Sequence, residues 1–210
     1  MIENATGIIL RTRPLTDTSL IVHWLTSEFG RLATVAKGAR RPKSPFAGKL
    51  DLFYGADFSF QRSRRSELHT LREVVLKETH AAIRKDMEYL QQASYAAALI
   101  EQTTEMETPI AEIHALFQSF LAQLTRHPAE PQTLFAFELK LLGELGLQPD
   151  PDKEKLTPDL KQILRILSVA DWDAIGRLKS TKTQTDALRR FLRDFIRYQF
   201  GRSPKLGDSI

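Results

Sequence analysis

The spacing of apolar residues changes near residue 80, and this change constrains the fold more than any other feature of the sequence. Before residue 80, apolar and polar residues alternate in short runs, which is typical of strands with one buried face. After residue 81, apolar residues recur every three to four positions, which is typical of amphipathic helices. The sequence therefore predicts an α+β protein, with a β domain over residues 1–80 and a helical domain over residues 81–210.

The first 80 residues contain five runs with strand character, and turn residues such as those of 14–17 and 28–31 separate them. The expected strands are residues 6–13, 18–26, 32–37, 50–61 and 67–77. Five short antiparallel strands without a helix between them predict a small closed barrel, since closure removes exposed sheet edges. An OB-fold is the first candidate, and an SH3-like barrel is the second.

The remaining residues contain several apolar stripes with helical spacing. The expected helices are residues 81–101, 110–124, 134–145, 159–169 and 188–199. The third is followed by Gly146, a residue type that commonly ends helices in the left-handed conformation. Three prolines within residues 147–158 predict a loop at that point.

The chain contains no cysteine, which excludes disulfides, thiol catalysis and cysteine-bound zinc or iron–sulfur sites. No apolar run approaches the roughly 18 residues that a membrane-spanning helix needs. The first residues also lack the basic start and apolar stretch of a secretory signal. We therefore expect a cytoplasmic protein that does not bind membranes, and one that is nucleoid-associated if its charge attracts DNA.

Charge is strongly segregated along the chain, although the net charge is only +4. Residues 1–80 carry 13 Lys/Arg against 8 Asp/Glu, residues 81–150 carry 4 against 10, and residues 151–210 carry 13 against 8. The sharpest excess lies between Arg31 and Arg65, where nine basic residues face two acidic ones. A field of this sign attracts polyanions, most often nucleic acid, although a solvated basic surface is the simpler alternative.

The basic residues of the β domain lie in or next to expected loops, where OB-folds hold single strands. The candidate phosphate contacts are Arg31, Lys37, Arg40, Arg41, Lys43, Lys49, Arg62, Arg64 and Arg65. The aromatic residues Trp24, Tyr54, Phe58 and Phe60 could stack on bases. Alternation puts Tyr54, Phe58 and Phe60 on one face, which favours core packing for these three.

The last expected helix carries Arg189, Arg193 and Arg197 at intervals of four, so we expect them to form an exposed basic stripe. Arg202 and Lys205 would extend this charge beyond the helix. The stripe predicts a second contact with an anion, either DNA or an acidic peptide. The alternative is ion pairing with Asp186 and Asp194 on the same helix, which would contribute only a few tenths of a kcal/mol per pair.

No catalytic motif is present: the chain lacks a phosphate-binding Gly-rich loop, a His-Glu-x-x-His pair and a Gly-x-Ser-x-Gly elbow. None of the five histidines pairs with another at metal-ligand spacing, and His23 on a strand is best explained as structural. Four acidic residues in the middle of the chain suit a solvated helix face better than a nuclease metal site: Glu101, Glu105, Glu107 and Glu112. The residues therefore predict a binding protein that is not an enzyme, with no cofactor, no metal and no small-molecule substrate.

Several motifs resemble those of one protein family. Phe29-Gly30-Arg31-Leu32 and Val35-Ala36-Lys37-Gly38-Ala39-Arg40 resemble the N-terminal barrel of RecO, the bacterial recombination mediator. The resemblance continues in residues 137–146, Phe-Glu-Leu-Lys-Leu-Leu-Gly-Glu-Leu-Gly, and in residues 190–206. It implies an N-terminal OB-fold followed by a helical domain.

The resemblance also implies function and partners. RecO proteins bind single- and double-stranded DNA, anneal complementary strands, and assist RecA loading onto strands coated by single-strand binding protein (SSB) in RecF-pathway repair. They bind RecR and the acidic C-terminal tail of SSB. Carried over by position, Lys37, Arg40 and Arg41 match the basic block of the barrel. Phe137 and Leu141 match the helix near which the family holds the SSB tail.

One departure of the sequence from the family concerns zinc. Many relatives carry a four-cysteine zinc module after the Leu-Gly helix, whereas residues 147–158 here contain no cysteine. The alternative to a recombination mediator is an RNA- or ribosome-associated OB-fold adaptor, since phosphate contacts alone do not distinguish the two.

Overall fold

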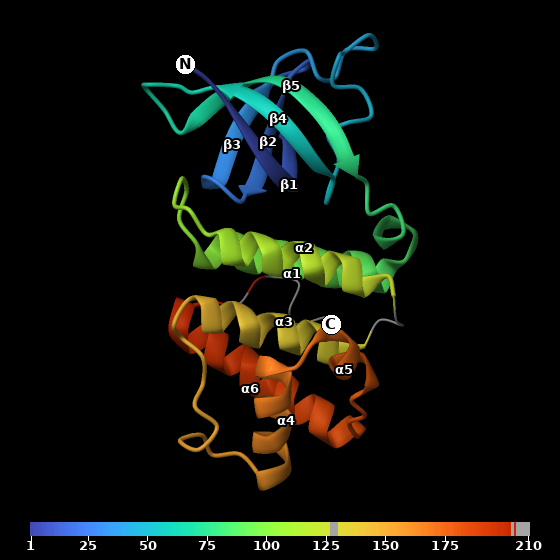
Figure 1. Ribbon diagram of the computed structural model, residues 1–210, viewed down its shortest axis with the longest axis vertical. Helices are drawn as coiled ribbons and strands as arrows, with labels where there is room; N and C mark the ends of the chain where they lie inside the picture. Colours follow the sequence, from blue (N-terminus) through green and yellow to red (C-terminus); the bar gives the residue numbers. More distant parts are fainter. Residues whose placement is uncertain (127–129, 203, 205–210) are drawn as a thin grey trace. The chain divides into compact units, whose positions relative to one another are not determined.

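The computed structural model of the protein describes residues 1–126, 130–202 and 204 (Figure 1). In this part of the chain, five strands are followed by six α-helices, with a short 3₁₀ turn at Ile83–Lys85. The strands are β1 (Ile2–Pro14), β2 (Leu20–Thr26), β3 (Gly30–Ala36), β4 (Gly55–Gln61) and β5 (Leu68–Glu78). The helices are α1 (Met87–Thr103), α2 (Ala111–Leu124), α3 (Pro131–Glu144), α4 (Pro158–Val169), α5 (Trp172–Arg177) and α6 (Lys182–Phe200).

The chain divides into two compact units. The barrel unit consists of Met1–Ala81 and Thr103–Ala115, and the helical unit consists of Ala82–Gln102 and Leu116–Ile210. The barrel unit thus contains a segment that follows α1 in the sequence, in addition to the residues predicted for the β domain. None of the helices in the described part of the chain has the length and apolar character that crossing a bilayer requires.

The five strands close into a barrel in the order β1-β2-β3-β5-β4. The long strand β1 closes it, because its first half pairs with β4 and its second half pairs with β2. All neighbouring strands are antiparallel except β3 and β5, which pair in parallel. This is the arrangement of an OB-like barrel, so the predicted fold class is confirmed and the SH3-like alternative is set aside.

Alternate positions of the strands fill the inside of the barrel with apolar side chains. The rings of Trp24 and Phe58 stack with their centroids 4.1 Å apart, and Trp24 Nε1 donates to Thr34 Oγ1 at 2.9 Å. Phe60 is fully buried beside them. Core packing is therefore confirmed for Phe58 and Phe60 and is also observed for Trp24, whereas Tyr54 stays half-buried.

The predicted strand over residues 50–61 is wrong at its start, because residues 51–54 form a turn. Tyr54 N donates to the carbonyl oxygen of Asp51 at 3.2 Å, and Asp51 Oδ1 accepts from Leu52 N at 2.8 Å. Aspartate commonly stabilises turns through such local bonds. β4 consequently begins at Gly55. The other strand boundaries lie within two residues of the predicted ones, except that β1 begins at Ile2.

The segment Thr103–Ala115 attaches to the barrel beside the start of β3. Glu107 N donates to the carbonyl oxygen of Arg31 at 2.9 Å, and Arg31 forms an isolated parallel bridge with Met106. The guanidinium of Arg31 donates to the carbonyl oxygen of Thr104. We call residues 104–108 the latch, because these contacts hold them against the barrel.

The latch approaches β3 so closely that position 30 requires glycine. A Cβ atom added to Gly30 would lie 1.8 Å from the carbonyl oxygen of Thr108. Gly30 also has a φ of +68°, in the left-handed region that other residues adopt only at a cost.

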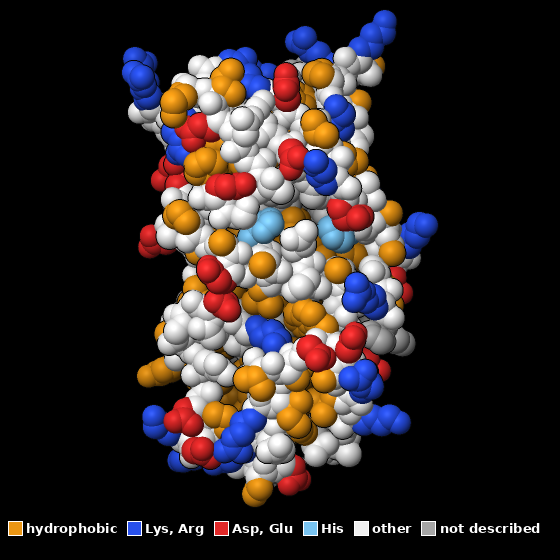
Figure 2. Space-filling view, in the orientation of Figure 1, with side chains coloured by type: hydrophobic (Ala, Val, Ile, Leu, Met, Phe, Trp, Pro, Cys, Tyr) orange, Lys and Arg blue, Asp and Glu red, His pale blue; other side chains and the backbone are white. Residues whose placement is uncertain are grey.

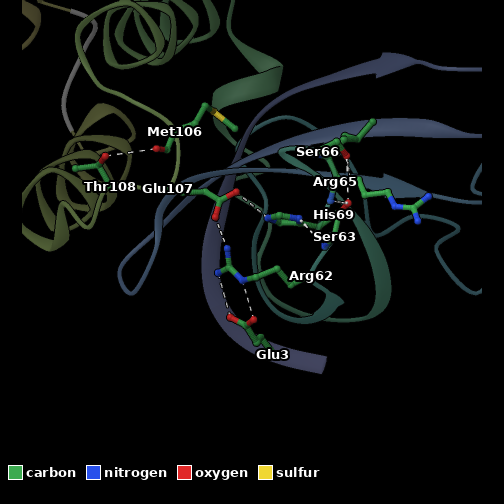
Figure 3. A network of polar contacts seen from close by, with 10 residues as sticks. Glu3, Arg62, Ser63, Arg65, Ser66, His69, Met106, Glu107 and Thr108 are labelled. Carbon is green, nitrogen blue, oxygen red and sulfur yellow. Dashed lines mark hydrogen bonds and ion pairs between the residues drawn. The ribbon is translucent and has the colours of Figure 1, made fainter. Parts of the chain in front are cut away.

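Arg62 joins the latch to the first strand through two carboxylates (Figure 3). Its guanidinium pairs with Glu3 at 2.7 Å and with Glu107 of the latch. Glu107 also lies 3.0 Å from Nε2 of the buried His69, whose Nδ1 accepts from Ser63 N at 3.2 Å. Nε2 therefore carries the ring proton that faces Glu107. The hydrogen bond from Arg62 holds the pKa of Glu3 below its ordinary value.

The helical unit has its own apolar core. α3 supplies Phe135 and Leu139, which pack with buried side chains of α4, α5 and α6. Residues 181 and 184 form a capping box at the start of α6, so this helix begins earlier than the apolar pattern predicts. The six-residue helix α5 was not predicted, since it is too short to show a helical period.

One carboxyl group is fully buried in the helical unit. Glu138 of α3 is 4% exposed and accepts a hydrogen bond of 2.5 Å from the hydroxyl of Tyr95 on α1. Burial raises the pKa of Glu138 to about 7, although the Tyr95 hydrogen bond and the charge of Arg189 on α6 oppose this shift. Because a buried carboxylate is costly, the helical unit favours the protonated form.

We expect Gly30→Ala to destabilise the barrel unit by about 2–5 kcal/mol, which combines the left-handed backbone cost with overpacking against Thr108. Gly48→Ala is the matched control. Gly48 has a φ of +72°, but an added Cβ would meet nothing within 4 Å, so only the backbone cost of about 1–2 kcal/mol applies. Chemical denaturation measures both values. Equal losses in the two variants would contradict the close approach of the latch.

We expect the contribution of Glu138 to stability to fall as pH rises from about 4.5 to about 7, because folded Glu138 holds its proton in a range where the unfolded chain loses it. The lowered pKa of His23 acts in the opposite direction over this range, so the test compares the parent protein with a variant at position 138. Glu138→Gln keeps the acceptor for Tyr95 but cannot ionise. At pH 8 this variant is expected to be more stable than the parent by about 3 kcal/mol, and at pH 4.5 the two are expected to be similar. Denaturation curves across this range test it, and parallel curves for the two proteins would argue against a buried titrating carboxyl.

Candidate nucleic-acid interface

Strand register places the barrel connections at two opposite ends. Leu20 pairs with both Pro14 and Ala36, so the β1–β2 and β3–β4 connections meet at one end. Ile2 pairs with Gln61, which places the β4–β5 hairpin at the other end. We call residues 15–19 and 37–54 the loop end, and residues 62–67 the hairpin end.

The long β3–β4 connection at the loop end is held by its own backbone. Hydrogen bonds of 3.1 Å link Arg41 N to Gly38 O, Ser44 N to Arg41 O, and Ala47 N to Ser44 O. Arg40 ties the connection to the β1–β2 turn, because its backbone N donates to Thr18 O at 3.0 Å. These turns give the basic residues of the connection a fixed scaffold.

The cations of this connection face solvent. Lys37, Arg40, Arg41 and Lys43 are exposed, and Lys49 is half-buried. Within the described residues, none of the five forms an ion pair with a carboxylate, and Arg40 Nη1 donates only to the carbonyl oxygen of Thr16 at 3.3 Å. In the space-filling view, Lys and Arg side chains stand out from the loops of the barrel (Figure 2). The structure thus brings five of the predicted residues together at the loop end.

Two further arginines extend this basic surface along β1, and the sequence analysis did not include them. Arg11 and Arg13 are exposed near the end of β1, with Arg13 opposite Ile21. Burial lowers the pKa of His23 to about 4, and the charges of Arg11, Arg13 and Arg31 add to this shift. His23 is therefore neutral at pH 7. The i, i+2 spacing of Arg11 and Arg13 before a turn was the signal that could have identified them.

The hairpin end contains predicted residues of two kinds. Arg64 and Arg65 are exposed on the hairpin and can reach an anion in solution. Arg62 is occupied by Glu3 and Glu107 and lies over the rings of Phe29 and Phe60. Arg31 donates to the latch, as described above. We therefore assign Arg31 and Arg62 to the attachment of the latch.

The arginines of α6 do not form the uniform exposed stripe that was expected. Arg197 is exposed, but Arg189 and Arg193 are half-buried. Arg189 pairs with Asp186 at 3.3 Å, and Arg193 Nε lies 3.5 Å from Asp194 Oδ1. Arg189 and Arg193 thus form the ion pairs within the helix that were the alternative. Both side chains also turn partly towards the buried face of the helix. Arg202 is exposed, and Lys205 lies outside the described residues.

Phe137 and Leu141 are core residues and not a surface contact for a partner. Phe137 is fully buried against Phe117 and Phe120 of α2, and Leu141 is 1% exposed. The resemblance assigned these two residues to a helix near a partner, but their side chains pack within the helical unit and are too buried to touch a partner directly.

The acidic residues of the middle segment do not assemble as a metal site. Among the described residues, no three His, Asp or Glu side chains come together in the manner of metal ligands. Glu107 pairs with Arg62 and His69, which gives it a structural function. Among the residues that the structure describes, the basic loop end is therefore the best candidate for a functional surface.

Comparison with known proteins agrees with this geometry. The family model described as "Recombination protein O N terminal" matches residues 1–80, which contain the barrel. The model described as "Recombination protein O C terminal" matches residues 84–154, which include α1, α2 and α3. The two matches follow each other along the chain and together cover well over half of it.

Curated relatives give the same result. The chain is 29% identical to the DNA repair protein RecO of Syntrophus aciditrophicus over 165 residues, which are 76% of this chain and 64% of that protein. It is 33% identical to RecO of an Anaeromyxobacter species over 147 residues, or 70% and 57%, and 30% identical to RecO of Bacillus subtilis over 150 residues, or 71% and 58%. The matched region thus spans about three fifths of each relative. From the matches to both family models and to these relatives, we conclude that the chain belongs to the RecO family of DNA repair proteins.

Proposed function

We propose that this protein acts in DNA repair and recombination by binding DNA through the loop end of its barrel. The observation that carries the proposal is the group of five cations between residues 37 and 49. They stand on a backbone fixed by turns, and carboxylates of the described residues leave them unpaired. Cations without an internal partner are the ones that a phosphate backbone can neutralise.

The proposed work of the protein is non-covalent. Contacts to phosphates carry no sequence information, so binding is expected to be independent of sequence. Two complementary strands repel each other through their phosphates, and a basic surface that neutralises both lets them approach and pair. Strand annealing and assistance to RecA loading on SSB-coated DNA are therefore the activities that we propose, together with binding to single- and double-stranded DNA.

Partner binding is also part of the proposal, and it is supported by family membership alone. RecR and the acidic tail of SSB are the proposed protein partners. Since Phe137 and Leu141 are buried, exposed basic residues are the better candidates for an acidic peptide. Arg190 and Arg197 on α6 are such residues in the helical unit.

Two variants of equal charge change test the loop end. Arg41→Ala with Lys43→Ala removes two cations from the loop end, and Arg64→Ala with Arg65→Ala removes two from the hairpin end. We expect the first variant to bind a single-stranded oligonucleotide about tenfold more weakly. The slope of log affinity against log salt concentration is expected to become shallower by about 1.4, because each of two lost phosphate contacts contributes roughly 0.7. The second is expected to have a smaller effect on both quantities. Fluorescence anisotropy across salt concentrations measures both.

The same variants separate this function from an RNA-associated one. Annealing of complementary DNA strands, bare and coated with SSB, is expected to be fast with the parent protein and slow with the loop-end variant. If the parent protein does not anneal DNA but binds structured RNA more tightly than single-stranded DNA, the RNA adaptor alternative replaces the proposal. Unchanged affinity and salt slope in the loop-end variant would remove the loop end as the binding surface.

A further inference from the structure

We propose that a pocket at the loop end accepts one unstacked nucleobase of the bound strand, a proposal that rests on the function proposed above. The pocket has a volume of about 260 Å³. Its walls include Leu20, Ala39, Phe46, Leu50, Asp51 and Tyr54. All of these come from the start of β2 or from the β3–β4 connection, the segment that carries the exposed cations.

The apolar walls of the pocket are continuous with the barrel core. Phe46 is 7% exposed and belongs to the core cluster that contains Trp24 and Phe58. Leu20, Leu50 and Tyr54 pack against the same cluster. The connection is further held by bonds from Phe46 N to Ser44 Oγ at 3.2 Å and from Lys49 N to Phe46 O at 3.1 Å. Because its walls are supported in this way, the pocket is preformed and little ordering is needed when a ring enters it.

The size of the pocket limits its occupant. Sites for drug-sized ligands measure roughly 300–1,000 Å³, so this pocket suits one small planar group. Its walls carry two aromatic side chains, Phe46 and Tyr54. Every base has a π-face that packs on such surfaces whatever its sequence, which agrees with phosphate contacts that are also independent of sequence.

The charged residues in and next to the pocket favour an occupant that has a neutral ring attached to an anionic chain. Arg40 follows the lining residue Ala39 directly, and Lys49 stands between the lining residues Gly48 and Leu50, so two cations adjoin the lining along the chain. The acidic residue Asp51, in contrast, is itself one of the lining residues. A carboxylate disfavours a phosphate or an acidic peptide inside the pocket, whereas the cations around it favour phosphates outside. A strand that places a base in the pocket and its phosphates outside satisfies both of these preferences.

The pocket predicts a preference for unpaired strands. A base within a duplex is stacked and paired, and moving it into a protein pocket costs a few kcal/mol. A single strand offers its bases with little of this cost. The loop end is therefore a surface whose cations hold both kinds of DNA and whose pocket adds affinity for the single-stranded kind.

Two variants remove the pocket without removing a cation. Tyr54→Ala takes away one aromatic wall, and Ala47→Trp places an indole at the exposed lining residue Ala47 so that the pocket is filled. Tyr54→Phe keeps the ring and serves as the control for the first. Ala81→Trp changes an exposed alanine in another turn and serves as the control for the second.

The probes are an oligothymidylate of about 12 nucleotides, within the site sizes of such barrels, and a strand of equal length with abasic residues in place of the bases. Both strands carry the same phosphates, so their difference in affinity reports base contacts alone. The parent protein and both controls are expected to bind the intact strand about tenfold more tightly than the abasic one. Tyr54→Ala and Ala47→Trp are expected to bind both strands with the affinity that the parent protein has for the abasic strand.

The outcomes separate this proposal from the one on which it rests. If the parent protein binds both strands equally, while Arg41→Ala with Lys43→Ala weakens both, the base pocket is wrong and the DNA surface stands. If that cation variant changes neither affinity, the DNA surface itself fails. A pocket-filling variant that keeps its preference for the intact strand but loses binding of a synthetic Asp/Phe peptide would also overturn the proposal, because the pocket would then serve a protein.

Discussion

Closure of the barrel by β1 is the constraint on which the rest of the barrel unit depends. This 13-residue strand pairs with β4 along its first half and with β2 along its second half. These two pairings determine which strand connections lie at each end of the barrel. The start of β3 and the end of β4 lie at the hairpin end, where Arg31 and Arg62 hold the latch. The connection with the exposed cations lies at the loop end. One closure therefore places the arginines that hold the latch at one end of the barrel and the five cations of the β3–β4 connection at the other.

The two groups of cations differ in what surrounds them and not in sequence character. Arg62 sits between two carboxylates and two aromatic rings, so a phosphate would have to displace an existing ion pair to reach it. Arg41 and Lys43 stand exposed on turns that are held by backbone bonds, and within the described residues a phosphate has no such competitor there. Since exposed charges are solvated and an ion pair with a mobile anion contributes little alone, affinity must come from several such contacts acting together. The adjoining pocket adds a contact of another kind, which is apolar and insensitive to salt.

The sequence predicted those features that depend on local spacing. Alternation identified the barrel and the buried positions of Phe58 and Phe60, because period two directly describes a strand with one face inside. What it missed depends on contacts between distant residues. Arg62 and Glu107 are 45 positions apart, so nothing local distinguished Arg62 from the exposed Arg64. A four-residue period placed Arg189 and Arg193 in one stripe, but only the packed helix shows how far that stripe turns towards the core. The pocket could not be predicted either, since turns at residues 44–54 create it.

The central claim is that the loop end of the barrel is the surface that DNA covers. Hydrogen exchange of backbone amides, measured with the whole protein alone and with a saturating single-stranded oligonucleotide, tests it most directly. The account predicts that exchange slows in residues 15–19 and 37–54 and stays unchanged in the hairpin, residues 62–67, and in the latch, residues 104–108. Protection that is confined to the hairpin or to the helical unit, with no change in residues 37–54, would contradict it.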